Sequence, residues 1–600
     1  MTSSPRAPLI IGLAALALTA GLAWPATGQQ AIEPPPPEAP AAAPKSLLPD
    51  SFETPAVRPA EAPLLLPTND GAAPVRIPGG APPLLSAPRL ETDPGALADP
   101  LAAPATGRDI TVVGPLSPAA GGYGLGTFMG SSGRFLASLA NRMNAPIGSR
   151  WAAITLSRAL LSESTAPSGI IPGDWVAARS SLLMRMGEID GAKRLVDSVP
   201  VDRYSPLLYR VAGQTALAAG DINGLCPIAA NGRLLSRDPL WDLAIGMCAA
   251  LQGDDITAAR VFDGLSEEEK RVEPFDVRLG ERIATIAGGA GRAAIIDWNE
   301  APRLTPFRYG VATASGVPVP ADKMGALGPA HFGWLVRNQG VDPEIRLESL
   351  RQAAVLGTMS ATEVVAGVSA LAPADAPADS RAGRLRVAFA GGSLANRRDA
   401  LRAIWTTAGD GEARYGALIE AATAAARLPV TSDSAADSAD IIAALLSAGD
   451  TRAALRWWPI ADKADTVVRA RAWALLATGT GGVPSAAGDF DDWRSAVNAT
   501  DHQAAMLLAG LAGLGVANGS DWAGLRRELL PATQTSWTRA IAAAATGRRA
   551  GEAIILAATG LQGAWKDVPP QHLYHIVAAL NRVGRPLEAR LIAAEAVTRA

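Results

Sequence analysis

The sequence predicts an all-α protein that is built from stacked helix pairs. A glycine turn recurs at Gly187, Gly220 and Gly253, and the interval between successive glycines is constant. Ser205-Pro206 and Asp238-Pro239 repeat at the same interval, and each places an N-cap residue before a proline at the first helical position. Two kinds of helix boundary with one shared period are typical of a helical-repeat array.

Composition and charge restrict the classes of partner. The chain has 600 residues, of which 18% are charged, and its formal net charge is −3. No basic stripe is present to neutralise phosphates, so the sequence does not predict a nucleic-acid partner. Hydrophobic residues make up 48% of the chain, which is enough to build a long helical array with a continuous core.

The N-terminus has the pattern of an export signal. Arg6 precedes a run of about 15 apolar or small residues from Leu9 to Ala23. Residues 1–28 are therefore predicted to be a signal peptide, with cleavage between Gly28 and Gln29, and the mature protein to be periplasmic or secreted. A transmembrane helix usually needs roughly 20 apolar residues. The alternative is an uncleaved segment, residues 7–24, that anchors the protein in the inner membrane.

A proline-rich segment follows the signal. Residues 29–118 contain 21 prolines, and Phe52 is their only aromatic residue. The apolar surface of this segment is too small to offset the entropy cost of ordering the chain. Residues 29–122 are therefore predicted to be a disordered linker. The glycine-rich stretch from Gly121 to Gly130 is interpreted as a flexible lead-in to the first helix.

The remainder of the chain divides into helical segments. Helical repeats are expected over 123–297 and 331–427. Residues 298–330 combine prolines with β-branched residues and lack a helical period, which indicates an irregular loop or a small hairpin. A C-terminal set of repeats is expected over 428–600, where glycine turns return at Gly449, Gly547 and Gly584.

The glycine turns are followed by a regular pattern of side chains. A small residue lies five positions after the turn and a larger apolar one four positions beyond it: Ala192 and Val196 in the first unit, Ala258 and Phe262 in the third. This pattern resembles the tetratricopeptide repeat over about 100 residues. The resemblance implies a right-handed α–α superhelix with a concave face that binds other proteins. The whole chain also resembles secreted bacterial proteins to which no activity is assigned.

The two cysteines fit the same architecture. Cys226 is expected at the start of the second helix of its repeat, and Cys248 near the end of the next first helix. Neighbouring antiparallel helices place such positions side by side, so in an oxidising compartment the two thiols can form a disulfide. Two buried free thiols are the alternative.

The sequence contains no pattern typical of catalysis or of metal binding. His572 and His575 share one helix face, but the H-E-x-x-H pattern of a zinc site is missing. We therefore predict no catalytic, cofactor-binding or metal-binding residues. Trp457 and Trp458 are adjacent, and because neighbouring helical residues cannot both face the core, they are predicted to include a contact for a partner.

These observations lead to a functional hypothesis. The chain is predicted to be an exported helical-repeat scaffold that binds protein partners in the cell envelope, without catalysis or a cofactor of its own. The alternative is an envelope enzyme that acts on glycan with carboxylates on the concave face of the superhelix.

Overall fold

A computed structural model describes residues 109–600, apart from 144–146, 268–270, 289–294 and 302. The described residues belong to one compact unit that spans residues 98–600. The predicted signal peptide, the cleavage candidates Gly28 and Gln29, and residues 29–108 of the predicted linker lie outside them.

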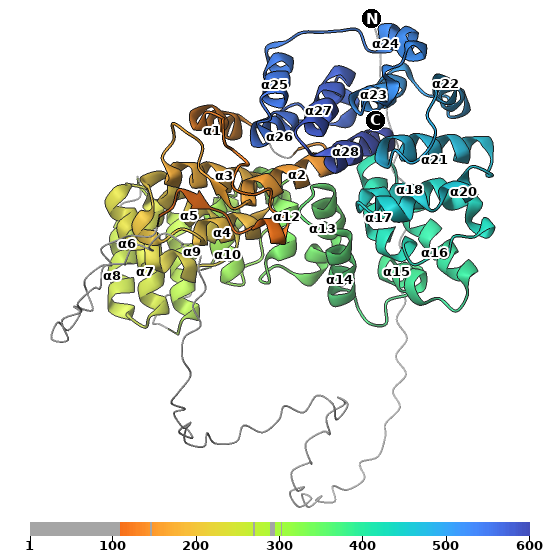
Figure 1. Ribbon diagram of the computed structural model, residues 1–600. Coiled ribbons are helices and arrows are strands. Elements are labelled where there is room, and N and C mark those ends of the chain that lie inside the picture. The colour runs from red at the N-terminus through yellow and green to blue at the C-terminus, as the bar shows by residue number, and fades with distance from the viewer. Residues whose placement is uncertain (1–108, 144–146, 268–270, 289–294, 302) are drawn as a thin grey trace, which may run out of the picture. The chain divides into compact units, whose positions relative to one another are not determined.

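The fold is all-α, which confirms the predicted class. Helices form most of the described chain (Figure 1). The two short strands, β1 (Val112–Val113) and β2 (Ser164–Thr165), are antiparallel, with Val113 opposite Ser164. Among the described residues, no helix combines the length and the apolar character that crossing a membrane requires.

The first half of the array contains α1 (Gly133–Arg142), α2 (Arg150–Leu161), α3 (Pro172–Met186), α4 (Ile189–Asp197), α5 (Pro206–Ala218), α6 (Cys226–Leu235), α7 (Pro239–Leu251), α8 (Asp255–Glu267), α9 (Pro274–Ile286), α10 (Pro306–Ala314), α11 (Ala321–Met324), α12 (His331–Arg337), α13 (Pro343–Val355) and α14 (Ala361–Leu371). The second half contains α15 (Arg381–Ala390), α16 (Leu394–Thr406), α17 (Gly411–Ala425), α18 (Ser438–Ser447), α19 (Thr451–Leu455), α20 (Trp458–Ala461), α21 (Thr466–Gly479), α22 (Ala487–Ala496), α23 (Asp501–Gly513), α24 (Ala523–Leu529), α25 (Ser536–Thr546), α26 (Ala550–Thr559), α27 (Pro570–Arg582) and α28 (Pro586–Arg599).

The boundary residues form the helix ends that their types favour. The Ser205 hydroxyl accepts a hydrogen bond from the N–H of Leu208 at the start of α5, and the Asp238 carboxylate caps α7 in the same way. Gly187 ends α3 in the left-handed conformation, with φ of 89°. Consecutive helices then pack side by side, α3 against α4 and α5, and α7 against α8 and α9.

The prediction of a loop or hairpin over 298–330 was wrong, because this segment contains α10 and α11. The Thr305 hydroxyl caps α10, and Pro306 occupies its first turn. Tyr309 is fully buried, and Gly310 lies so close to α5 that a Cβ atom would be 2.2 Å from the Leu217 carbonyl oxygen. Packing against α5 therefore stabilises a helix that the β-branched residues do not favour on their own.

The ordered chain begins earlier than the predicted linker boundary at 122. Within residues 109–122, the Val113 side chain is buried and belongs to β1. The buried Arg179 guanidinium in α3 donates a hydrogen bond to the Val113 carbonyl oxygen at 3.0 Å. Packing against helices orders this segment, although its own apolar content is low.

The glycine-rich stretch is a packed connection, and its interpretation as a flexible lead-in was wrong. Phe128 is fully buried, with its ring edge against Trp175 of α3. The N–H of Gly551 in α26 donates to the Thr127 carbonyl oxygen at 2.8 Å, and a Cβ atom at Gly551 would lie 2.4 Å from the Phe128 ring. The Tyr123 hydroxyl donates to the Glu588 carboxylate at 3.0 Å. The stretch thus joins the start of the array to its last repeats.

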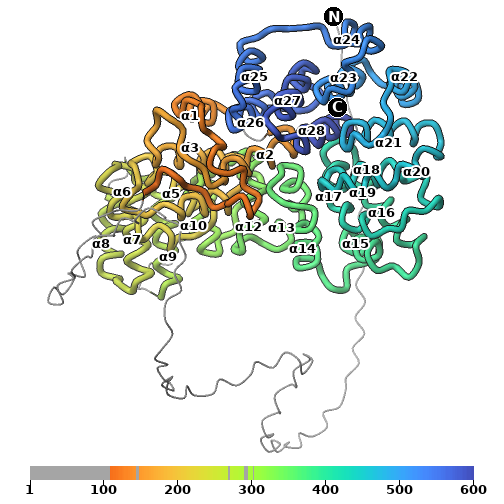
Figure 2. The backbone as a smooth tube through the Cα atoms, in the orientation of Figure 1, coloured from red at the N-terminus to blue at the C-terminus, as the bar shows by residue number. Residues whose placement is uncertain are grey.

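The first two helices of the described chain lie beside helices near its C-terminus. In Figures 1 and 2, α2 contacts α26 and α28, and α1 contacts α26, although these helices are remote from them along the chain. The Glu595 carboxylate of α28, which is 2% exposed, accepts hydrogen bonds from the N–H groups of Arg150 and Trp151 and from the Ser149 hydroxyl, at 2.8, 3.0 and 2.7 Å. A carboxylate of the last helix therefore caps the N-terminus of α2.

The Arg150 side chain extends the same junction. Its buried guanidinium donates to the carbonyl oxygens of Ala354, Met359 and Ser447, at the ends of α13 and α18 and in the turn before α14. Cations are favoured at helix C-termini because unpaired carbonyl groups point outward there. We name Ser149, Arg150, Trp151 and Glu595 the α2 junction.

The α2 junction should contribute strongly to stability. Replacing Glu595 with Ala leaves the N–H groups of α2 and the Arg599 guanidinium, 2.7 Å from the carboxylate, without their buried partner. We expect a loss of about 3–5 kcal/mol in the free energy of unfolding, measured by chemical denaturation. Glu412→Ala is the control, because the Glu412 side chain is 77% exposed and its pair with Arg599 should contribute about 1 kcal/mol or less. Equal effects of the two substitutions would contradict the assignment.

Candidate functional site

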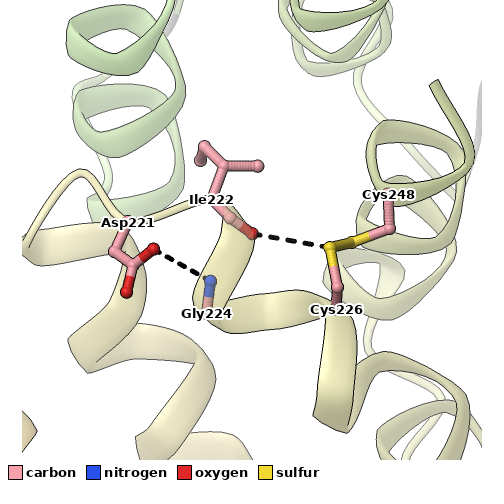
Figure 3. Close-up of a disulfide and its surroundings, with 5 residues drawn as sticks. All are labelled: Asp221, Ile222, Gly224, Cys226 and Cys248. Atoms are coloured by element: carbon pink, nitrogen blue, oxygen red, sulfur yellow. Dashed lines mark hydrogen bonds between the residues drawn. A yellow bond between two sulfur atoms is a disulfide. The ribbon is translucent and has the colours of Figure 1, made fainter. Parts of the chain in front are cut away.

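The two cysteines form a disulfide between α6 and α7 (Figure 3). Their Cα atoms are 5.5 Å apart, and the Cys226 sulfur lies 3.9 Å from the Ile222 carbonyl oxygen. Just before α6, the Asp221 carboxylate accepts a hydrogen bond from the N–H of Gly224 at 2.9 Å. The disulfide therefore fixes the start of a short helix to its neighbour and serves a structural role.

The two adjacent tryptophans differ in their surroundings. Trp457 is 1% exposed, so its prediction as a partner contact was wrong. It lies between α19 and α20, where the chain turns its side chain into the core. Trp458 packs against the same core but keeps part of its surface exposed, so the prediction now concerns Trp458 alone.

The described residues contain no group of three or more His, Cys, Asp or Glu side chains that could hold a metal ion. The two histidines of α27 pack against an aromatic neighbour instead. The His572 ring lies 4.3 Å from the Trp537 ring, and the His575 ring lies 6.5 Å from it. Burial, together with the charge of His572, lowers the pKa of His575.

The strongest candidate for a functional site is a groove between α14 and α15. Its volume is about 550 Å³, within the range of sites that bind ligands or peptide side chains. The groove is lined mainly by apolar side chains, and its two ionisable residues are arginines. The lining residues are Val365, Val368, Ser369, Ala372, Pro373, Ala374, Ala382, Leu385, Arg386, Phe389, Ala390 and Arg427.

The two walls of the groove are helix faces. Val365 and Val368 of α14 and Ala372 at its C-terminal end follow the spacing i, i+3, i+7. Ala382, Leu385 and Phe389 repeat this spacing on α15. Val368 and Leu385 are buried in the floor, and Val365 and Phe389 are half-buried at the rims. Two such stripes that line one groove provide apolar contacts for a guest segment with its own apolar stripe.

The position of α14 is fixed at its N-terminus. Ser360 and Glu363 form a capping box, in which each side chain accepts a hydrogen bond from the other residue's N–H. The Arg337 guanidinium of α12 donates to the Glu363 carboxylate at 2.8 Å and to the Thr358 carbonyl oxygen at 3.0 Å. Burial alone would raise the pKa of Glu363, but these hydrogen bonds and the charge of Arg337 lower it.

The position of α15 depends on a buried carboxylate, that of Glu420. Glu420 of α17 is fully buried and accepts hydrogen bonds from Arg351 of α13 and Arg381 of α15, with shortest distances of 2.8 and 2.6 Å. Burial would raise the pKa of Glu420, but the charges of the two arginines lower it. The carboxylate therefore stays ionised and joins α15 to α13 and α17.

The two arginines of the groove have different environments. Arg386 donates to the carbonyl oxygens of Ala374 and Ala376, and so fixes the loop that closes one end of the groove. The Arg427 guanidinium lies 4.9 Å from the centre of the Phe389 ring, and it has no carboxylate partner among the described residues. An exposed cation thus lies at the rim of an apolar surface.

Sequence reasoning missed this groove. Most of its residues lie in segments that were predicted to be helical, and apolar residues at this spacing usually contact a neighbouring helix. The one signal was the loop from 373 to 380, which contains Pro373 and Pro377 and separates α14 from α15.

Comparisons of the chain with models of protein families, with curated proteins and with solved structures found no match.

Glu188 lies at the start of α4, where the charges of Arg337 in α12 and Glu363 in α14 act on it. Burial raises the pKa of Glu188 to about 7. The charge of Arg337 lowers it, that of Asp190 raises it, that of Arg194 lowers it and that of Glu363 raises it, in decreasing order of effect. The protonated carboxyl is therefore favoured at this position.

The free energy of unfolding should fall as pH rises through the range in which Glu188 titrates. The unfolded state loses the Glu188 proton near pH 4.5 and the folded state near pH 7, so the folded state binds more protons between these values. Glu188→Gln keeps the side chain neutral. The free energy of unfolding of this variant, relative to the native chain, should therefore increase from pH 4.5 to 7 and then level off. A difference that is independent of pH would contradict this, and denaturation at a series of pH values decides it.

Removal of the disulfide should destabilise the α6 region. The bridge closes a loop with a sequence separation of 22 residues, which contributes about 3 kcal/mol in the chain-entropy model. In the double variant Cys226→Ala/Cys248→Ala, we expect faster amide hydrogen exchange in α6 and α7 and unchanged exchange in α21. Uniform acceleration across the chain, or none, would contradict a local role.

Proposed function

We propose that this chain is an exported helical-repeat scaffold that binds protein partners in the cell envelope and has no catalysis of its own. The α14–α15 groove is the observation that supports binding most directly, since it is an apolar surface between two helices that ion pairs hold in position. The apolar run from Leu9 to Ala23 supports export, and the glycine turns with their tetratricopeptide-like spacing support a scaffold.

The occupant of the groove is an amphipathic helix of a partner protein that carries a carboxylate beside its apolar stripe. Both walls present side chains at helical spacing, which favours a helical guest over an extended one. Arg427 provides the charge complementarity, because its guanidinium is exposed at the rim without an acidic neighbour among the described residues.

Site-specific crosslinking in living cells tests this binding. A photoreactive residue at Ser369, which is exposed in the groove, should give one discrete adduct in the envelope fraction. The crosslinked partner peptide should combine apolar residues at helical spacing with Asp or Glu. The same photoreactive residue at Val467 of α21, which is 45% exposed and outside the groove, is the matched control.

Substitution of residues at the rim of the α14–α15 groove completes the test. Phe389→Glu and Val365→Glu should each reduce the Ser369 adduct at least tenfold, because a carboxylate in the groove repels an acidic partner and removes apolar contact. Val467→Glu should leave the adduct unchanged. Persistence of the adduct in both groove variants, identical adducts from the two labelled positions, or recovery of the protein in the cytoplasm would overturn the proposal.

A further inference from the structure

A second site lies in the C-terminal half, where α28 packs against α17, α18 and α21. It is a pocket of about 210 Å³, which we name the α28 pocket. Gln503 and Ala600 lie on one side of it, where the Gln503 amide donates to the Ala600 backbone oxygen at 3.0 Å. The pocket is separate from the α14–α15 groove and shares no residue with it.

The charged side chains of the α28 pocket are two arginines and one aspartate. The Asp440 Oδ1 atom accepts a hydrogen bond from Arg414 Nη2 at 2.7 Å and from Arg471 Nη2 at 2.6 Å. One carboxylate oxygen is thus shared by two guanidinium groups. Asp440 is only 16% exposed, so its ion pairs with the two arginines are partly shielded from water.

The guanidinium groups of Arg414 and Arg471 differ in the number of hydrogen bonds that they donate. Arg414 also donates through Nη1 to the Trp405 carbonyl oxygen at 3.2 Å, which fixes its orientation. Asp440 is the one hydrogen-bond partner of Arg471 within the described chain, and the Arg471 side chain is 40% exposed. A guanidinium carries five N–H donors, so Arg471 retains donors for a further anion.

The remaining walls of the pocket are apolar. Leu418, Leu475 and Trp493 contribute large side chains, and Ala443 and Ala596 leave room between them. A phosphate or sulfate ion would leave these walls without contacts, whereas a molecule with an apolar body would displace water from them. A pocket of this volume accepts a ligand no larger than an aromatic or short-chain acid.

We infer that the α28 pocket binds a small organic acid, whose single carboxylate pairs with Arg471 and Arg414 and whose apolar body contacts Leu475 and Trp493. Arg471 keeps N–H donors that no described residue uses, and guanidinium groups bind carboxylates through paired hydrogen bonds. This site goes beyond partner binding in the α14–α15 groove and does not depend on it.

Isothermal titration of the purified full chain with benzoate, benzamide and inorganic phosphate tests this site. Any purification tag is placed at the N-terminus, because Ala600 lines the pocket. Benzoate should bind at least tenfold more tightly than benzamide, which has the same shape without the charge, and more tightly than phosphate. Equal affinities for benzoate and benzamide, tighter binding of phosphate, or no heat of binding with benzoate would overturn the inference.

Two variants of α21 locate the binding. Arg471→Gln should weaken benzoate binding about ten- to hundredfold, as expected for loss of a hydrogen bond to a charged group, and Arg471→Lys should weaken it less. Arg469→Gln is the matched control, because Arg469 lies on the same helix, pairs with Asp462 and does not line this pocket. Equal loss of affinity in Arg471→Gln and Arg469→Gln, or no loss in the former, would overturn the assignment. Circular dichroism checks that both variants are folded.

Discussion

The carboxylate of Glu595, buried between the last helix and the start of α2, is the constraint on which the array depends. It binds the N–H groups of Arg150 and Trp151, and so places α28 at a fixed position relative to the first repeats. The Arg150 side chain then bonds to the carbonyl oxygens of Ala354 and Met359, on either side of the turn that leads into α14. The wall of the candidate groove is thereby connected to the contact between the two ends of the array.

Such a contact is unusual for a helical-repeat protein. In an open array each repeat contacts only its neighbours, and stability is a sum of local terms. Here the first N–H groups of α2 and the Arg150 guanidinium have all their partners only when the segments that contain Met359, Ser447 and Glu595 are in place. Buried polar groups are costly when unpaired, so the junction favours one arrangement of the repeats over others.

The features that were predictable from the sequence are those governed by neighbouring residues. Ser205 and Asp238 cap helices because a short polar side chain reaches an N–H group within the next turn, and Gly187 ends a helix because it tolerates a positive φ. The helix at 306–314 was not predictable from its own residues, because they have a low helix propensity. Its packing against Leu217 on α5 stabilises it instead. The glycine-rich stretch was interpreted as flexible because its stabilising contacts are also remote along the chain. Phe128 packs against α3, and the Thr127 carbonyl oxygen accepts a hydrogen bond from α26.

The candidate sites were hidden for a related reason. Val365 and Phe389 have the spacing of core residues, and only the separation of α14 from α15 leaves them half-buried. Arg414 and Arg471 belong to different repeats, on α17 and α21, so their shared use of Asp440 appears only after folding. The disulfide between Cys226 and Cys248 was predictable from the sequence, because adjacent antiparallel helices place the two residues side by side.

The α2 junction also determines the order in which this chain can complete its fold. Arg150 and Glu595 are 445 residues apart, and ribosomes add roughly 5–20 residues per second. The N-terminus of α2 therefore waits roughly 20–90 s for its capping carboxylate after it has been synthesised. Early repeats can form helices and pack against their neighbours during that interval, and only the contacts of the α2 junction wait for the last helix.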